Sequence, residues 1–186
     1  MFTWRHSMVR IEGNEMKLSQ MVRAALQVSD LDRSKAFYVD VLGLSEVYSE
    51  GAAQGGNMHA LIGAPDSVTT RVCVLKQPDF SAYGMVGLFE VTNPAPPRIE
   101  RPSQGSNIGE LCMVFYCSDL DELIRRARNH DHTVICDPVR LRVGGYIKQR
   151  EMAMRGPDGE KINLIEWDPD EAIAGARPEK WQGDPE

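Results

Sequence analysis

The stretch Ser118-Asp119-Leu120-Asp121 occurs twice in this chain, because the same four residues stand at Ser29-Asp30-Leu31-Asp32. The second copy begins 89 positions after the first (118 against 29). Each copy follows an apolar run, at 24–28 and at 113–117, and each precedes an amphipathic segment. A motif that recurs in the same context indicates an internal repeat, so the duplication is the first feature to explain.

A pair of similar turns supports the repeat. Ala64-Pro65-Asp66-Ser67 resembles Gly156-Pro157-Asp158-Gly159, 92 positions later (157 against 65), and both turns lead into apolar segments. We therefore interpret the chain as two modules, at 18–92 and 109–168, joined by a proline-rich linker at 93–108. An extension at 1–17 precedes them. An acidic tail at 169–186 follows, with Trp181 as its one candidate anchor.

The hydrophobic pattern predicts the same order of elements in each module. The first module has predicted strands at 18–28, 44–48, 58–62, 71–76 and 85–91, and a helix that begins after Asp30 and ends at Gly43. The second has predicted strands at 110–117, 133–135, 146–154 and 162–167, and a helix at 119–129. One such sheet leaves a face bare, so two modules must combine. We expect an α+β fold in which two tandem βαβββ modules form a curved, mostly antiparallel sheet with a concave cavity.

Composition excludes several classes of function. The 186 residues are 42% hydrophobic and 26% charged, and the net charge of −6 argues against nucleic-acid binding. No apolar run approaches the roughly 20 residues that span a membrane, and the first 20 residues lack the apolar core of a secretory signal. Four cysteines without a CxxC spacing are expected to be buried thiols in a reducing compartment. The sequence therefore favours a cytoplasmic protein.

These patterns resemble the vicinal oxygen chelate superfamily, which includes glyoxalase I, bleomycin-resistance proteins, extradiol dioxygenases, epimerases and fosfomycin-resistance enzymes. The resemblance covers about 21–168 and is carried by the segments 26–38, 42–44, 115–121, 155–159 and 162–164. It implies the duplicated βαβββ fold, a small-molecule ligand and pairing of chains into a homodimer. One fold hosts unrelated chemistries, so the chemistry must be argued from the site.

Enzymes of this superfamily usually hold a divalent metal through His, Glu or Gln at four inward strand positions. The resemblance places these positions at Arg23, Cys73, Cys112 and Asn163. An arginine offers only hydrogen-bond donors and cannot ligate a cation, and an asparagine is a poor ligand for a transition metal. Two cysteines fall short of the three or four ligands that zinc requires. We therefore expect no metal at these positions.

Alternation along the strands extends the predicted cavity beyond these four positions. The candidate ligand-binding residues are Arg23, Gln27, His59, Cys73, Glu110, Cys112, Tyr116, Glu151 and Asn163. A buried arginine needs a partner, which is either Glu110 or Glu151 within the protein or a carboxylate or phenolate of a ligand. Cys112 as a nucleophile lacks a histidine base that the sequence places beside it.

Two functions remain open from the sequence. The first is binding of a small anionic or aromatic organic ligand in the concave sheet without a metal, either for sequestration or for a metal-independent reaction. The alternative is a lyase, isomerase or dioxygenase of the glyoxalase type, with Fe, Mn, Ni or Zn held at other positions such as His59, Glu110 and Glu151. In a third reading the cavity is filled by the protein's own side chains.

Overall fold

The computed structural model describes residues 20–54, 57–78, 80, 83–102, 105–130, 132–143 and 147–166. The extension at 1–17, the tail at 169–186 and Trp181 lie outside the described residues. The first half contains β1 (Arg23–Val28), α1 (Leu31–Ala36), a π-helical turn η1 (Phe37–Val41), β2 (Glu46–Gln54), α2 (Asn57–Ile62), β3 (Thr69–Lys76) and β4 (Met85–Thr92). The second half contains β5 (Cys112–Cys117), α3 (Leu120–Asn129), β6 (Val134–Val143), β7 (Ile147–Arg155) and β8 (Lys161–Glu166). None of the described helices is long and apolar enough to cross a membrane.

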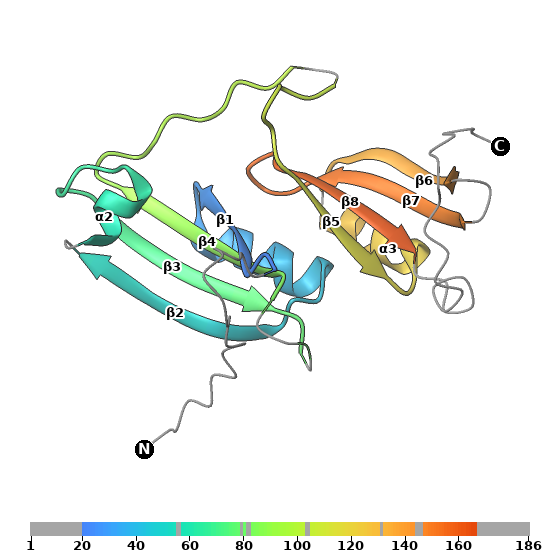
Figure 1. Cartoon of the computed structure of the whole chain (residues 1–186), viewed down its shortest axis with the longest axis horizontal. Helices are drawn as coiled ribbons and strands as arrows, with labels where there is room; N and C mark the ends of the chain where they lie inside the picture. The colour runs from blue at the N-terminus through green and yellow to red at the C-terminus, as the bar shows by residue number, and fades with distance from the viewer. Residues whose placement is uncertain are drawn as a thin grey trace, which may run out of the picture.

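The strands form two four-stranded sheets. Sheet 1 has the order β1-β4-β3-β2 and sheet 2 the order β5-β8-β7-β6. In each sheet the outer strand β1 or β5 is parallel to its neighbour, and the other pairs are antiparallel. Figure 1 shows the two sheets side by side, with α1 and α3 behind them. The α+β fold and the duplicated strand order confirm the prediction, although the strands divide into two mixed sheets.

Both copies of the repeated motif begin a helix for the same reason. Asp30 accepts a hydrogen bond from the Arg33 backbone N–H at 3.0 Å, and Asp119 accepts one from the Glu122 N–H at 2.9 Å. These caps satisfy backbone donors that the first helical turn leaves without a partner. The leucine after each cap is fully buried, so the motif also anchors the helix to the core.

The last aspartate of the motif ties the helix to two strands. Asp32 on α1 accepts a hydrogen bond from Arg71 of β3 at 3.0 Å, and Arg71 also reaches Glu90 of β4 at 3.1 Å. The equivalent group in the second module consists of Asp121, Arg150 and Glu166. Hydrogen bonds from the arginine of this second group hold the pKa of its glutamate below the usual value. The repeat therefore extends to side-chain contacts.

The spacing of these equivalent residues corrects the predicted repeat. The aspartates lie 89 positions apart, the arginines 79 and the glutamates 76. The offset between equivalent residues decreases by ten positions between the helix and the third strand of each module. In this interval the first module contains the additional helix α2 (Asn57–Ile62). The prediction of a strand at 58–62 was therefore wrong. The turn at Asp66 precedes β3, whereas the turn at Asp158 precedes β8, so the two turns are not equivalent.

A single hydrophobic core is built from both modules. The core lies between the helical segments α1, η1 and α3 and the sheet faces that these segments cover. Phe37, Leu88, Leu120 and Leu164 are among its members. The opposite faces of the sheets, which we call the helix-free face, carry exposed residues on β1 and β5. The two outer strands therefore present alternate residues to solvent.

Candidate functional site

Strand register shows which residues occupy equivalent inward positions in the two modules. Asn163 of β8 lies beside Val114 of β5. The same place in sheet 1 is held by Gly87 of β4, which lies beside Ala25 of β1. The first-module counterpart of Asn163 is therefore Gly87, a residue that the sequence did not single out.

Cys73 does not belong to the predicted cavity. Its side chain is fully buried in the hydrophobic core, on the side of β3 that faces the helices. The sequence placed it inward because the two similar turns suggested one constant spacing. The α2 insertion shifts that spacing, so the prediction selected a residue of the third strand instead of the fourth.

Gly87 lies on the helix-free face of sheet 1 with two side chains packed against it. A side-chain Cβ at Gly87 would stand 3.1 Å from Cε2 of Phe89 and 3.5 Å from Cδ of Arg23. Gln27 is the register partner of Phe89 on the neighbouring strand. Because Gly87 has no side chain, the aromatic ring of Phe89 and the stem of Arg23 can approach its backbone closely. We call this group the Gly87 site and define it by Arg23, Gln27, Gly87 and Phe89.

Arg23 is exposed, where the sequence predicted a buried side chain. Within the described residues its guanidinium has no hydrogen-bond or ion-pair partner. Glu110 pairs instead with Arg155 at 3.1 Å, and Glu151 accepts a hydrogen bond from Asn163 at 3.2 Å. The internal Arg–Glu pair that the sequence left open is thus absent from the described part of the chain, and the Arg23 charge faces solvent.

Of the remaining predicted residues, four lie in sheet 2 and His59 lies on α2. Cys112 and Tyr116 are exposed on β5, and Asn163 and Glu151 are hydrogen-bonded to each other on β8 and β7. His59 lies apart from them, fully buried on α2, with both ring nitrogens lacking a hydrogen-bond partner among the described residues. In Figure 1, α2 lies at the end of sheet 1, far from sheet 2.

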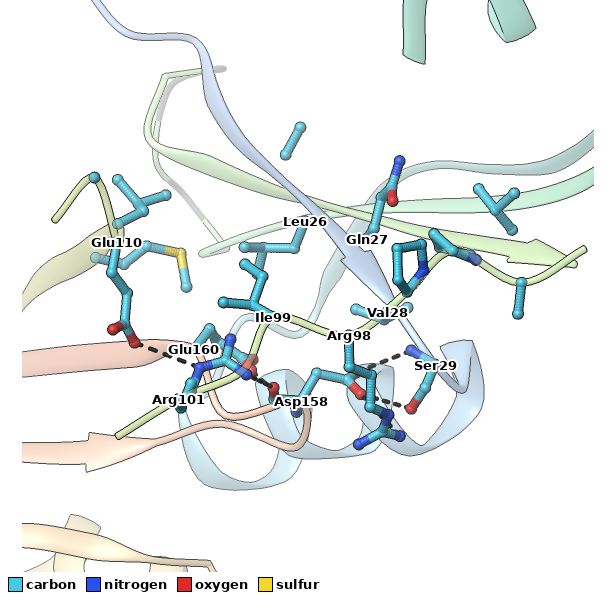
Figure 2. Close-up of a pocket in the computed structure, with 18 of the residues that line it drawn as sticks. Leu26, Gln27, Val28, Ser29, Arg98, Ile99, Arg101, Glu110, Asp158 and Glu160 are labelled. Atoms are coloured by element: carbon cyan, nitrogen blue, oxygen red, sulfur yellow. Dashed lines mark hydrogen bonds and ion pairs between the residues drawn. The ribbon is translucent and has the colours of Figure 1, made fainter. Parts of the chain in front are cut away.

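A pocket of about 450 Å³ lies where the edge of β1 meets the linker and the β7–β8 turn. Figure 2 shows Leu26, Gln27, Val28 and Ser29 along one wall and the linker residues Arg98, Ile99 and Arg101 opposite. We call it the junction pocket. Its lining includes the apolar residues Leu26, Ile99, Leu111 and Met113 and the charged residues Arg98, Arg101, Glu110, Asp158 and Glu160.

Comparison with protein families identifies the chain. The model of the Glyoxalase/Bleomycin resistance protein/Dioxygenase superfamily matches residues 20–164. The chain belongs to this superfamily. It is also 30% identical over 152 residues to the uncharacterized protein YaeR of Escherichia coli (strain K12), covering 80% of this chain and 97% of YaeR.

Solved structures share the fold of this superfamily member. A glyoxalase family protein from Bacillus cereus superposes with a TM-score of 0.68 and 19% identity, covering 83% of this chain and 97% of that chain. TnmS3, an antibiotic binding protein from a Streptomyces species, has a TM-score of 0.53 and 18% identity, covering 83% of this chain and 100% of that chain. At these identities the likeness concerns the fold alone.

The metal positions of the glyoxalase superfamily do not fit a metal in this chain. By strand register they are held by Arg23, Gly87, Cys112 and Asn163. Gly87 supplies no donor atom and the arginine supplies only N–H donors, so two of the four positions cannot ligate. The alternative set of His59, Glu110 and Glu151 is not brought together, and the described residues contain no group of three His, Cys, Asp or Glu placed for a metal.

Sequence reasoning missed the residues of the junction pocket except Gln27 and Glu110. Arg98 and Arg101 stand in a segment whose prolines indicate a linker and nothing more. Both arginines reach the pocket because the linker passes across the β7–β8 turn. No local sequence pattern predicts that path. Two arginines close together in a proline-rich linker were the one signal available.

Proposed function

We propose that this superfamily member binds a small organic anion, preferably an aromatic one, at the Gly87 site without a metal. The observation that carries the proposal is the guanidinium of Arg23, which has no partner among the described residues and lies on the helix-free face where the resemblance implies the first metal ligand. A carboxylate accepts two parallel hydrogen bonds from a guanidinium, and a phenolate oxygen accepts a charge-assisted hydrogen bond. An aromatic ring of the ligand would contact the ring of Phe89, which packs beside the Arg23 stem at Gly87.

Two further points support this proposal. TnmS3, which shares the fold, is described as an antibiotic binding protein, so the architecture is compatible with holding an organic molecule. The exposed residues of β1 also leave the helix-free face of sheet 1 open to a ligand. We keep the cytoplasm as the proposed location, supported by four cysteines that form no disulfide.

Ligand titrations of Arg23 and Gly87 variants test the Gly87 site. A thermal-shift screen of benzoate, salicylate and naphthoate should find a binder, since binding to the folded state raises Tm. Arg23→Gln should weaken that binder at least tenfold by calorimetry, because a charge-assisted pair contributes about 1.5–3 kcal/mol. Gly87→Ala should also weaken it, since the new methyl group would displace the Phe89 ring and the Arg23 stem.

Gly51→Ala is the matched control, because a Cβ at that β2 position meets nothing within 4 Å. Its affinity should equal that of the unmodified protein. Equal affinity of the Arg23→Gln variant would contradict the proposal. Stoichiometric Fe, Mn, Ni or Zn in protein purified without chelators would contradict the metal-free proposal. It would support the alternative, a metal-dependent lyase, isomerase or dioxygenase.

We also propose that the protein forms a homodimer through the exposed surface around β5. Val114 is 56% exposed and Tyr116 59%, and Leu111 and Ile108 continue this apolar surface toward the linker. An exposed apolar row on an outer strand favours association. Sedimentation velocity at micromolar concentration should give a dimer that Val114→Glu converts to monomer, whereas Val47→Glu on β2 leaves it intact. A monomeric unmodified protein would contradict this proposal.

A further inference from the structure

We propose that the junction pocket is a second binding site, for an amphipathic organic anion such as an aliphatic carboxylate, whose charged group pairs with Arg98. The site is separate from the Gly87 site, since neither Arg23 nor Gly87 lines it. The inference therefore does not depend on the function proposed above.

The size and the walls of the pocket suit an organic molecule. Its volume of about 450 Å³ lies within the range of about 300–1,000 Å³ that small-molecule sites occupy. Apolar side chains come from β1, from the linker and from the start of β5, represented by Leu26, Ile99 and Met113. An apolar ligand chain of moderate length would be removed from water on several sides.

The carboxylates of the pocket are already occupied by protein groups. Glu110 accepts hydrogen bonds from the Asn107 backbone N–H at 3.0 Å and from Arg155 at 3.1 Å, and its side chain is only 4% exposed. The Asn107 N–H and then Arg155 hold the pKa of Glu110 below its usual value, so this carboxylate stays ionised and engaged. It offers little to a cationic ligand.

The two acidic residues of the β7–β8 turn are engaged in the same way. Asp158 accepts hydrogen bonds from the Ser29 N–H at 3.0 Å, from the Ser29 hydroxyl at 2.5 Å and from Arg33 at 3.1 Å. Glu160 accepts from the Tyr38 hydroxyl at 2.9 Å and from the Asp158 N–H at 3.0 Å. Together these contacts leave the turn without a free acceptor for a cationic group.

The charges of the network that surrounds the pocket leave one cation in excess. Arg98 and Arg101 line the pocket together with the three carboxylates Glu110, Asp158 and Glu160. Arg33 and Arg155 pair with two of these carboxylates from outside the lining, so the whole network has four guanidinium groups for three carboxylates. A largely apolar space beside such a network favours an anion.

Arg98 is the guanidinium with the weakest attachment. Its Nη2 lies 3.7 Å from Asp158, and its side chain is 71% exposed. Arg101, by contrast, donates to the Asp158 carbonyl at 2.8 Å and lies 3.4 Å from Glu110. An exposed ion pair at that distance contributes little, so Arg98 is able to exchange Asp158 for a ligand carboxylate while Arg101 holds the linker in place.

Calorimetric titration with octanoate tests the site in the full-length protein. Octanoate should bind, whereas octylamine and octanol, which have the same chain without the negative charge, should bind at least tenfold more weakly. Arg98→Ala should weaken octanoate about tenfold, as expected for loss of one charge-assisted pair. Arg128→Ala is the matched control, since this exposed arginine on α3 pairs with Asp137 outside the pocket.

The Arg23→Gln variant separates this pocket from the Gly87 site. It should bind octanoate with less than a twofold change, even if it no longer binds an aromatic acid. The inference is overturned if octanoate does not bind, if octylamine binds as well as octanoate, or if Arg98→Ala and Arg128→Ala have the same effect. It is also overturned if Arg23→Gln alone abolishes octanoate binding, because the anion would then occupy the Gly87 site.

Discussion

Replacing Asp158 with alanine should lower the free energy of unfolding by about 3 kcal/mol, whereas Asp66→Ala should change it by less than about 0.5 kcal/mol. Asp158 joins the second module to the start of α1 through its contacts with Ser29 and Arg33, and its side chain is only 16% exposed. Asp66 is exposed in a turn of similar sequence. Two aspartates in turns of similar sequence therefore differ in stability effect, because Asp158 connects the two modules and Asp66 is exposed.

Urea unfolding followed by circular dichroism measures both changes. The m-value should be the same in the two variants and the unmodified protein, so that the shift in midpoint reports stability alone. Ser29→Ala should reproduce part of the Asp158→Ala loss. An equal loss in the Asp66 and Asp158 variants would show that the contact between the modules does not stabilise the fold.

Tyr38→Phe should lower the free energy of unfolding by about 2 kcal/mol. The hydroxyl of this fully buried tyrosine donates to Glu160, which is 7% exposed, and its removal leaves a buried carboxylate with fewer donors. Burial first, and then the nearby Glu160, raise the pKa of Tyr38, so the phenol keeps its proton and remains a donor throughout the ordinary pH range.

Tyr83→Phe provides the comparison for this change. Tyr83 is 41% exposed, so the same loss of a hydroxyl should alter stability by less than about 0.5 kcal/mol. Combining Tyr38→Phe with Glu160→Leu should cost less than the two single changes added, because the pair is then removed as a unit. Simple additivity would indicate that the hydroxyl and the carboxylate act independently.

Local features with a strong sequence signal were predictable, whereas a short apolar run was not. The caps at Asp30 and Asp119 depend on a few neighbouring residues, and the structure has both. The run at 58–62 is too short to distinguish a strand from a helix by its apolar pattern, and the structure has α2 there.

The candidate site shows the same division. The resemblance selected Arg23, alternation along the same strand added Gln27, and both side chains are exposed on β1. Gly87 was missed because its place beside Ala25 follows from pairing between strands that lie far apart in the chain. The expected burial of Arg23 was wrong because the helices cover only the other side of sheet 1.

The shared core bears on how such a chain arose. The segments α1, η1 and α3 and both sheets contribute to one apolar interior drawn from both modules, so a half-length chain would expose that interior to water. Such a chain would need a second copy of itself to bury it. Fusion of two copies makes the partner permanent and raises its effective concentration. It also lets the two halves differ, as they do where one has Gly87 and the other Asn163.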